Sequence, residues 1–444
     1  MNESWITILL AILHILLYIG AVFLVKRPII SLFHLAIAKY AIAFGIRPFL
    51  SAFHDNYTIY TGNFSLSEYN FGLLIQLLFN LIFVISYILF IRKQDIARPV
   101  LMSYISTRSM LIPLTVGCIS VLLIHVLSGG SWMATERSQT LTSVVPFGKF
   151  LFPIAAIPLM VMIPTIYIWA KSKKSRSIIA LAFGCITITL LTLLYQRGFI
   201  LIGIIVLFWL HERIRGLSYA RVITTGTLLL IGLMIIRPLA KFIMLQGQVD
   251  FMSLMFSHGD HNAFVSFFLF GPNFDNIDVW PIILNFISDN GFLFGTTFIS
   301  LISRFATPSL RQDYGLLSAV DQINAYHWGD LYWRNNFGFN VTLAQELFVN
   351  FGVASLLFAV LPAYASARLD RWLQRVSTLS LASLATVSAV FFTGGFVGEL
   401  SGIIQWSVAM IIIGSLLKYI DNLRVLPSTT QHNNPVKAVE RTDL

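Results

Sequence analysis

Several basic side chains lie in or beside apolar runs, and the most informative is Arg197, which has no acid close by in sequence. Arg197 occupies a tight turn, 195-YQRG-198, between two such runs. Arg237 and Lys241 are four residues apart, so they share one face of a helix. The other basic residues of this kind are Lys39, Arg47, Arg137, Lys149, Arg304, Arg311 and Arg334. A guanidinium binds phosphate oxygens in pairs, which predicts a phosphate or pyrophosphate ligand. The alternative is that each arginine extends to lipid headgroups or caps a helix end.

Carboxylates are fewer, and the most informative is Glu346 at the beginning of an apolar run. Asp275 and Asp278 lie in 273-NFDNID-278, and Asp330 follows later. A carboxylate beside an apolar run can accept a proton from a sugar hydroxyl. The alternatives for each are a helix cap or an ion pair with one of the arginines.

The segment 326-YHWGDLYWRNNFGFN-340 places aromatic rings beside Tyr326, His327, Asp330 and Arg334. Rings next to hydrogen-bonding amides and charges indicate a sugar-binding surface. The alternative is an aromatic belt at a membrane interface.

Signatures of several other chemistries are missing from the sequence. The cluster 258-HGDH-261 matches no strong metal-ligand spacing, so we predict neither a metal site nor a cofactor. There is no Walker loop, Rossmann glycine run, serine nucleophile elbow or HExxH motif. This excludes an ATP-driven pump and a metalloprotease from the predicted classes.

Composition predicts that these residues are positioned by membrane helices. Of the 444 residues, 57% are hydrophobic and only 11% are charged, whereas soluble domains are about one-quarter charged. Lipid cannot satisfy a bare backbone, so long apolar runs predict spanning helices. We predict an all-α polytopic protein with about eleven spans: 5–25, 29–50, 69–91, 109–127, 149–170, 177–195, 198–212, 222–240, 342–366, 378–396 and 402–420.

Basic residues predict the orientation of the spans. One set of alternate connections, together with the tail, holds 20 of the 30 lysines and arginines. Basic residues favour the cytoplasmic side, so we predict a periplasmic N-terminus and a cytoplasmic C-terminus. The net charge of +10 therefore reflects membrane topology, and we predict no nucleic-acid partner.

One connection is much longer than the rest. It divides the chain into eight spans (1–240), a large periplasmic loop (241–341), three spans (342–420) and a disordered cytoplasmic tail (421–444). Short apolar pieces within the loop, such as 280-WPIILNFIS-288, predict interfacial or re-entrant helices lying over the bundle.

This pattern resembles the Wzy-type family of O-antigen and lipid-linked oligosaccharide repeat-unit polymerases. The resemblance rests on one large outer loop between late spans and on the arginine of the turn 195–198. It also rests on 299-ISLISRFATPSL-310 and 337-FGFNVTLAQELFVNFGVASLLF-358. Within that family the pieces are most similar to the polymerases of enterobacterial common antigen.

The resemblance implies a GT-C-like glycosyltransferase of the bacterial inner membrane. It would join oligosaccharide units carried on undecaprenyl pyrophosphate, among membrane lipids and with a chain-length regulator and a flippase as partners. The resemblance assigns catalysis to Arg197, Arg304, His327 and Glu346. It assigns substrate binding to a second set, Arg237, Lys241, Arg311, Tyr326, Asp330 and Arg334.

Two other functions fit the same sequence. An O-antigen ligase performs the same chemistry with lipid A core as the acceptor. A transporter or flippase of lipid-linked sugars would instead need polar residues along a path through the middle of the membrane.

Overall fold

The computed structural model describes the chain in separate stretches. The continuous stretches are 3–25, 31–54, 64–91, 107–127, 177–193, 275–298, 317–335 and 341–375; shorter described pieces lie within 154–167 and 207–228 and at 313–315 and 339. All regular elements within these stretches are helices. The all-α prediction is therefore confirmed for the part of the chain that the structure describes.

Four described segments are long and apolar enough to cross a membrane. They are α1 (Glu3–Leu24); the run of α2 (Leu32–Ala41), η1 (Ile42–Ile46) and α3 (Arg47–His54); α4 (Leu66–Ile91); and the run of α18 (Leu343–Phe351), η6 (Gly352–Ala359) and α19 (Val360–Arg375). They correspond to the predicted spans 5–25, 29–50, 69–91 and 342–366. By length and composition, the described residues thus contain four candidate membrane spans, as a polytopic helical protein requires.

The remaining predicted spans are described in part or not at all. Two shorter apolar helices, α5 (Thr107–Leu127) and α8 (Ser177–Leu193), coincide with the predicted spans 109–127 and 177–195. Predicted spans 149–170, 198–212 and 222–240 are described only in pieces, and 378–396 and 402–420 lie outside the described residues.

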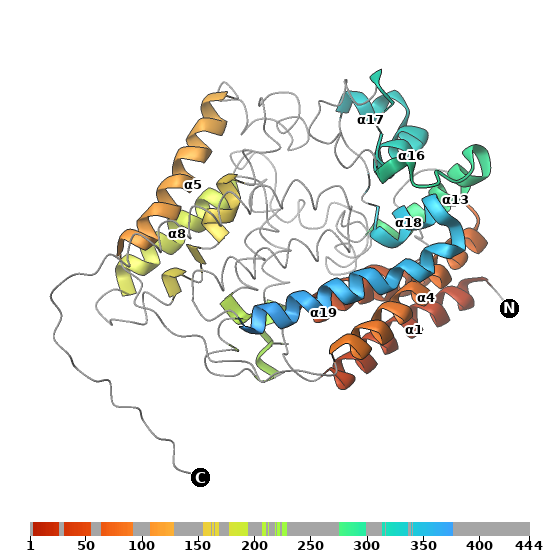
Figure 1. The fold of residues 1–444 in the computed structure, drawn as a ribbon, viewed down its shortest axis with the longest axis horizontal. Coiled ribbons are helices and arrows are strands. Elements are labelled where there is room, and N and C mark those ends of the chain that lie inside the picture. Colours follow the sequence, from red (N-terminus) through yellow and green to blue (C-terminus); the bar gives the residue numbers. More distant parts are fainter. Residues whose placement is uncertain are drawn as a thin grey trace, which may run out of the picture.

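Helices α1, α4 and α19 lie side by side and form the main described bundle (Figure 1). The pieces of the long loop gather at one end of this bundle, where α1 and α4 begin; we call it the loop-side end. They include η5 (Asp275–Asp278), α13 (Val279–Asn290), α16 (Ala319–Trp328) and α17 (Asp330–Asn335). At the opposite end the backbone N–H of Leu32 donates to Asp370, 2.9 Å away.

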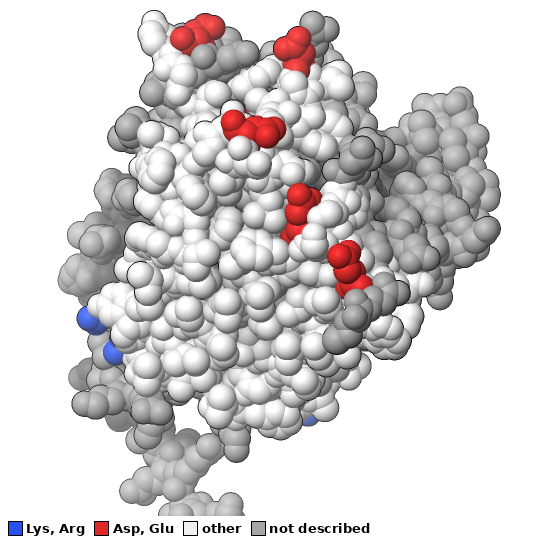
Figure 2. Space-filling view, turned by 90° about the vertical axis from the view of Figure 1, so that its right-hand side faces the viewer, with Lys and Arg blue, Asp and Glu red and all other residues white. Residues whose placement is uncertain are grey.

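Charge differs between the two ends of the bundle. Exposed acids at the loop-side end include Glu3, Asp289 and Asp330, and the face in Figure 2 shows Asp and Glu across it with Lys and Arg only at its lower edges. Arg368 and Arg371 lie near the other end, on α19. The orientation predicted from the basic residues of the sequence stays a prediction.

A topology experiment tests that orientation. A reporter inserted after Asn290 is expected to report the periplasm, and one inserted after Ser175 the cytoplasm. Asn290 is exposed at the end of α13, and Gly291 has no atom within 4 Å of a built Cβ, so an insertion there should be tolerated. A cytoplasmic signal from position 290 would invert the topology and place every candidate site residue in the wrong compartment.

The predicted span 342–366 is found, but it is interrupted. Gly352 has φ +58°, which ends α18 sharply, and the chain continues as η6 and α19. Eight consecutive residues of α18, Leu343 to Asn350, are buried. Helix α18 is therefore a short buried helix at the loop-side end of this candidate span, which continues through η6 and α19.

Candidate functional site

The structure describes only part of the predicted site. Arg197, Arg237, Lys241, Arg304 and Arg311 lie outside the described residues. Arg334 belongs to α17, but its side chain is not described. Tyr326, His327, Asp330 and Glu346 are described, and all four lie at the loop-side end, on α16, α17 and α18.

Tyr326 and His327 form the edge of α16 that faces outward. The Tyr326 hydroxyl donates to Asp289 Oδ2 at 2.6 Å, and its ring packs edge-on against Phe286. This hydrogen bond raises the pKa of Tyr326 above its ordinary value. His327 packs edge-on against Trp328, and partial burial lowers its imidazole pKa, which favours the neutral ring.

Polar contacts hold α16 against the chain that leads into α18. The Asn324 amide accepts from the backbone N–H of Phe339 at 2.9 Å and donates to its carbonyl at 3.2 Å. Ser318 and Asp321 form a capping box, and Tyr332 donates to Asp321 at 2.6 Å. Because these groups are tied together, α16 and the start of α18 have a fixed relation.

Helix α18 presents a series of polar residues that are all buried. Thr342 and Gln345 form its capping box, and Glu346 lies in its first turn with 1% of its surface exposed. One turn later, the Asn350 amide oxygen accepts from the backbone N–H of Gly295 and from the Thr297 hydroxyl. The positive end of the helix dipole favours a carboxylate at the position of Glu346.

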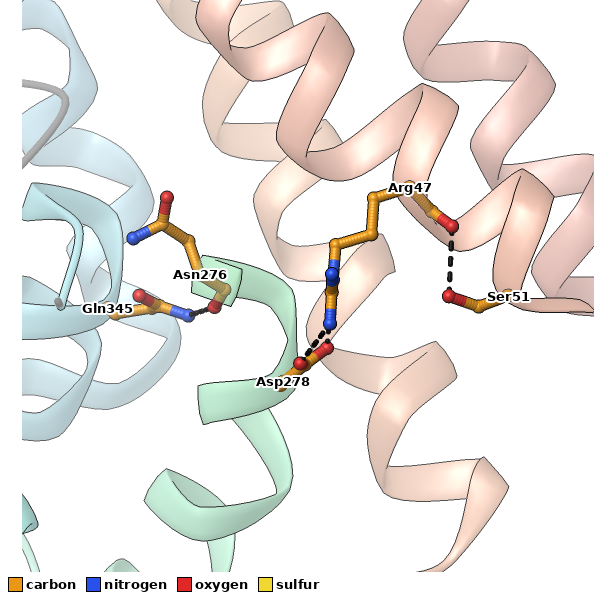
Figure 3. A network of polar contacts seen from close by, with 5 residues as sticks. All are labelled: Arg47, Ser51, Asn276, Asp278 and Gln345. Carbon is orange, nitrogen blue, oxygen red and sulfur yellow. Dashed lines mark hydrogen bonds and ion pairs between the residues drawn. The ribbon is translucent and has the colours of Figure 1, made fainter. Parts of the chain in front are cut away.

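Beside α18 lies a second buried polar group, which we call the ionic cluster: Arg47, Asn276, Asp278 and Gln345 (Figure 3). Arg47 makes an ion pair with Asp278, and both side chains are fully buried. The Gln345 amide donates to the carbonyl oxygen of Asn276. The cluster therefore joins the second span, the loop and α18, from positions 231 and 69 residues apart in sequence.

A local irregularity positions Arg47. The five residues before it, Ile42–Ile46, form a π-helix, which inserts an extra residue into the turn and re-aims the side chains that follow. Gly45 lies where a Cβ would come within 2.8 Å of Ile15, so α1 approaches closely at this turn. The guanidinium is thereby directed toward the loop (Figure 3).

Only two of the four residues of the ionic cluster, Arg47 and Asp278, could be singled out from the sequence. Arg47 and Asp278 each belong to the charged residues that need a partner at a membrane, but nothing in the sequence pairs them. Asn276 contributes a backbone carbonyl and Gln345 is an ordinary capping residue, so neither carries a signal of its own. An arginine inside an apolar span was the usable signal.

The loop enters the bundle through a close contact between Gly72 and Trp280. A Cβ built on Gly72 of α4 would lie 2.3 Å from Trp280 Cβ and Cγ, and Trp280 is completely buried. Residues 276–283 are all buried, whereas 288–291 are exposed, so α13 descends into the bundle at its N-terminus. Whether 280–288 is interfacial or re-entrant, as the sequence predicts, stays a prediction.

This contact predicts the effect of the smallest substitution at Gly72. Gly72→Ala is expected to lower the free energy of unfolding by about 1–3 kcal/mol, because the methyl group displaces Trp280 and the rest of α13. Gly20→Ala on α1 is the matched control, since no atom lies within 4 Å of a Cβ built there. Thermal unfolding of both purified variants measures the difference, and equal midpoints would show that Trp280 is not held by α4.

Three polar groups at this end of the bundle differ in the chemistry that they can perform. The Arg47–Asp278 pair is neutral overall and already satisfied, so it suits holding the loop in place. Glu346 is a carboxylate at the mouth of a membrane helix, where it can accept a proton from a hydroxyl brought to it. The Tyr326–Asp289 pair is exposed and offers a ring and a carboxylate together.

Fold and site describe a helical protein with four candidate membrane spans among its described residues, pieces of the long loop at one end of the bundle and a buried carboxylate at that end. Comparison with family models, with curated proteins and with solved structures gives no match to this chain. The further assignment therefore depends on the residues themselves.

Proposed function

We propose that the protein is a glycosyltransferase that joins oligosaccharide repeat units carried on undecaprenyl pyrophosphate. It works at the outer face of the bacterial cytoplasmic membrane, with a GT-C-like arrangement of about eleven spans. The observation that supports this most directly is Glu346. It is a buried carboxylate in the first turn of a helix that ends a membrane span, at the end of the bundle where the loop gathers.

The reaction requires few groups. A hydroxyl of the acceptor unit attacks the anomeric carbon of the donor glycan, the bond to the lipid pyrophosphate breaks, and the hydroxyl proton passes to a base. Glu346 is our candidate for that base. Arg197, Arg237 and Arg304 are the candidates for the charge that develops on the leaving pyrophosphate.

The exposed surface of α16 and α17 suits the sugar portion of the substrate. Tyr326 is 40% exposed, and its hydroxyl is fixed by Asp289. Asp330 is exposed at the start of α17, and His327 lies beside Tyr326. An aromatic face flanked by carboxylates offers stacking together with acceptors for sugar hydroxyls.

Deletion of the gene tests the class of reaction. Loss of a polymerase is expected to leave surface lipid capped with a single repeat unit, which a gel of surface glycans resolves. Complete loss of attached repeats would instead indicate a ligase or a flippase, the two alternative functions. Purified protein should lengthen a lipid-pyrophosphate-linked oligosaccharide without ATP or nucleotide sugar.

Treatment with a chelator tests how the leaving group is stabilised. Activity of the purified protein is expected to survive an excess of EDTA with less than about a twofold change, because arginines take the place of a metal cation. Strict dependence on added Mg²⁺ or Mn²⁺ would contradict this and direct attention to the 258-HGDH-261 cluster.

A further inference from the structure

A line of buried polar residues follows the interface between α1 and α4 at membrane depth. His14 of α1 and Gln76 and Asn80 of α4 are each no more than 3% exposed, whereas the exposed side chains on the other faces of both helices are mostly apolar. His14 lies eleven residues beyond Glu3, or about 16 Å along the helix, which is near the middle of a hydrocarbon layer about 30 Å thick.

Hydrogen bonds join these residues in a single direction. The Gln76 amide donates to Asn80 Oδ1 at 3.0 Å, and Asn80 Nδ2 lies 3.5 Å from His14 Nδ1. His14 Nε2 lies 3.2 Å from the carbonyl oxygen of Leu73. A carbonyl can only accept, so Nε2 carries the proton and Nδ1 accepts from Asn80. Every bond therefore points from Gln76 toward Leu73.

The series of hydrogen bonds begins at an amide whose oxygen, Gln76 Oε1, is unsatisfied. This acceptor is buried and has no hydrogen-bond partner among the described residues. An unsatisfied buried acceptor costs about 1–3 kcal/mol in general, and lipid offers nothing to relieve it. Interhelical bonding alone explains Asn80 and His14, but it leaves Gln76 Oε1 unexplained.

The side chain that packs on α4 one turn before Gln76 carries a hydrogen-bond donor. Trp280 of α13 packs on Gly72, four residues before Gln76 on the same face of α4. Its indole Nε1–H is also buried with no hydrogen-bond partner among the residues that the structure describes. One helical turn rises about 5.4 Å, and one water molecule bridges two partners roughly 4.5–5 Å apart, so side chains one turn apart are within its reach.

We propose that Trp280 and Gln76 form a binding site for one water molecule, which links the loop to the α1–α4 interface. The water accepts from Trp280 Nε1–H and donates to Gln76 Oε1. Donors then run without reversal from Trp280 through the water, Gln76, Asn80 and His14 to the Leu73 carbonyl. This site does not depend on the proposed glycosyltransferase activity.

The experiment observes the water at Trp280 directly. In full-length ¹⁵N-tryptophan protein in lipid nanodiscs, the Trp280 indole proton, assigned by its loss in Trp280→Phe, is expected to show a water cross-peak. Gln76→Met keeps the volume but removes the acceptor, and the cross-peak should disappear. An indole proton without a water contact in the native protein, or one whose contact persists in Gln76→Met, would overturn the proposal.

A thermal double-mutant cycle provides a second measurement. Trp280→Phe and Gln76→Met are each expected to lower the unfolding midpoint by about 2–4 °C. The double variant should fall by clearly less than the sum of the two single variants, because both remove the same water. Only the packing lost at position 280 and the Asn80 bond lost at position 76 should still add. Trp280→Phe combined with Thr7→Val is the control. Thr7 donates to Asn70, which is not part of the series of hydrogen bonds from Gln76 to Leu73, so the two shifts in midpoint should add fully. Additive shifts in both pairs would refute the link.

Discussion

Glu346→Gln is expected to reduce polymer formation about 10²–10⁴-fold, the usual loss when a general base is removed. The amide has nearly the same shape as the carboxyl, so the buried first turn of α18 should stay packed. The protein should therefore accumulate in the membrane at the normal level. The measurement is glycan chain length on a gel, with the variant expressed in a deletion strain, and the rate of lengthening by the purified protein.

Asp313→Asn is the matched control, because it makes the same carboxyl-to-amide change on an exposed residue of the long loop. It should leave chain length and rate unchanged. Polymer of full length made at the normal rate by Glu346→Gln would show that Glu346 belongs to the packing of α18, and the base would then have to be another group.

Arg47→Met is expected to destabilise the protein by about 3–5 kcal/mol, because Asp278 is then left as a buried, uncompensated charge. Asp278→Leu should destabilise the protein by a similar amount, since it leaves the buried Arg47 guanidinium without its counter-charge. The double variant Arg47→Met/Asp278→Leu should recover most of the loss, because neither charge remains to be desolvated. Equilibrium unfolding of the purified variants in mixed micelles gives the three values.

An exposed arginine provides the comparison. Arg368 bonds the Tyr364 hydroxyl on the surface of α19, so Arg368→Met should change stability by less than about 0.5 kcal/mol. If the double variant at positions 47 and 278 were as unstable as the two single variants added together, the pair would not be the contact that holds the loop.

Long apolar runs made the membrane helices predictable. The spans expected at 5–25 and 69–91 agree with α1 and α4 to within three residues at each end. Such runs report composition over a whole helix, and lipid allows few other structures for them. Helices η1 and η6 were not foreseen, because a π-helix or a 3-10 segment leaves apolar content unchanged.

Contacts between distant segments were not predictable. The sequence marked Arg47 and Asp278 as charges in need of partners, but their pairing depends on how η5 enters the bundle beside Gly72. Tyr326 was expected at a sugar surface, yet its bond to Asp289 comes from a residue 37 positions away. Each of these contacts depends on tertiary geometry, which a single sequence does not contain.

The way α18 ends bears on how the protein is assembled. The backbone N–H groups of Leu293 and Phe294 donate to the carbonyl oxygens of Val349 and Asn350, at 3.0 and 3.1 Å. These carbonyls belong to the last turn of a helix, where the helix itself supplies no donor. Residues 293–294 leave the ribosome about fifty residues earlier than α18. The loop segment is therefore synthesised before α18, and it supplies two donors that the last turn of α18 lacks until the two segments meet.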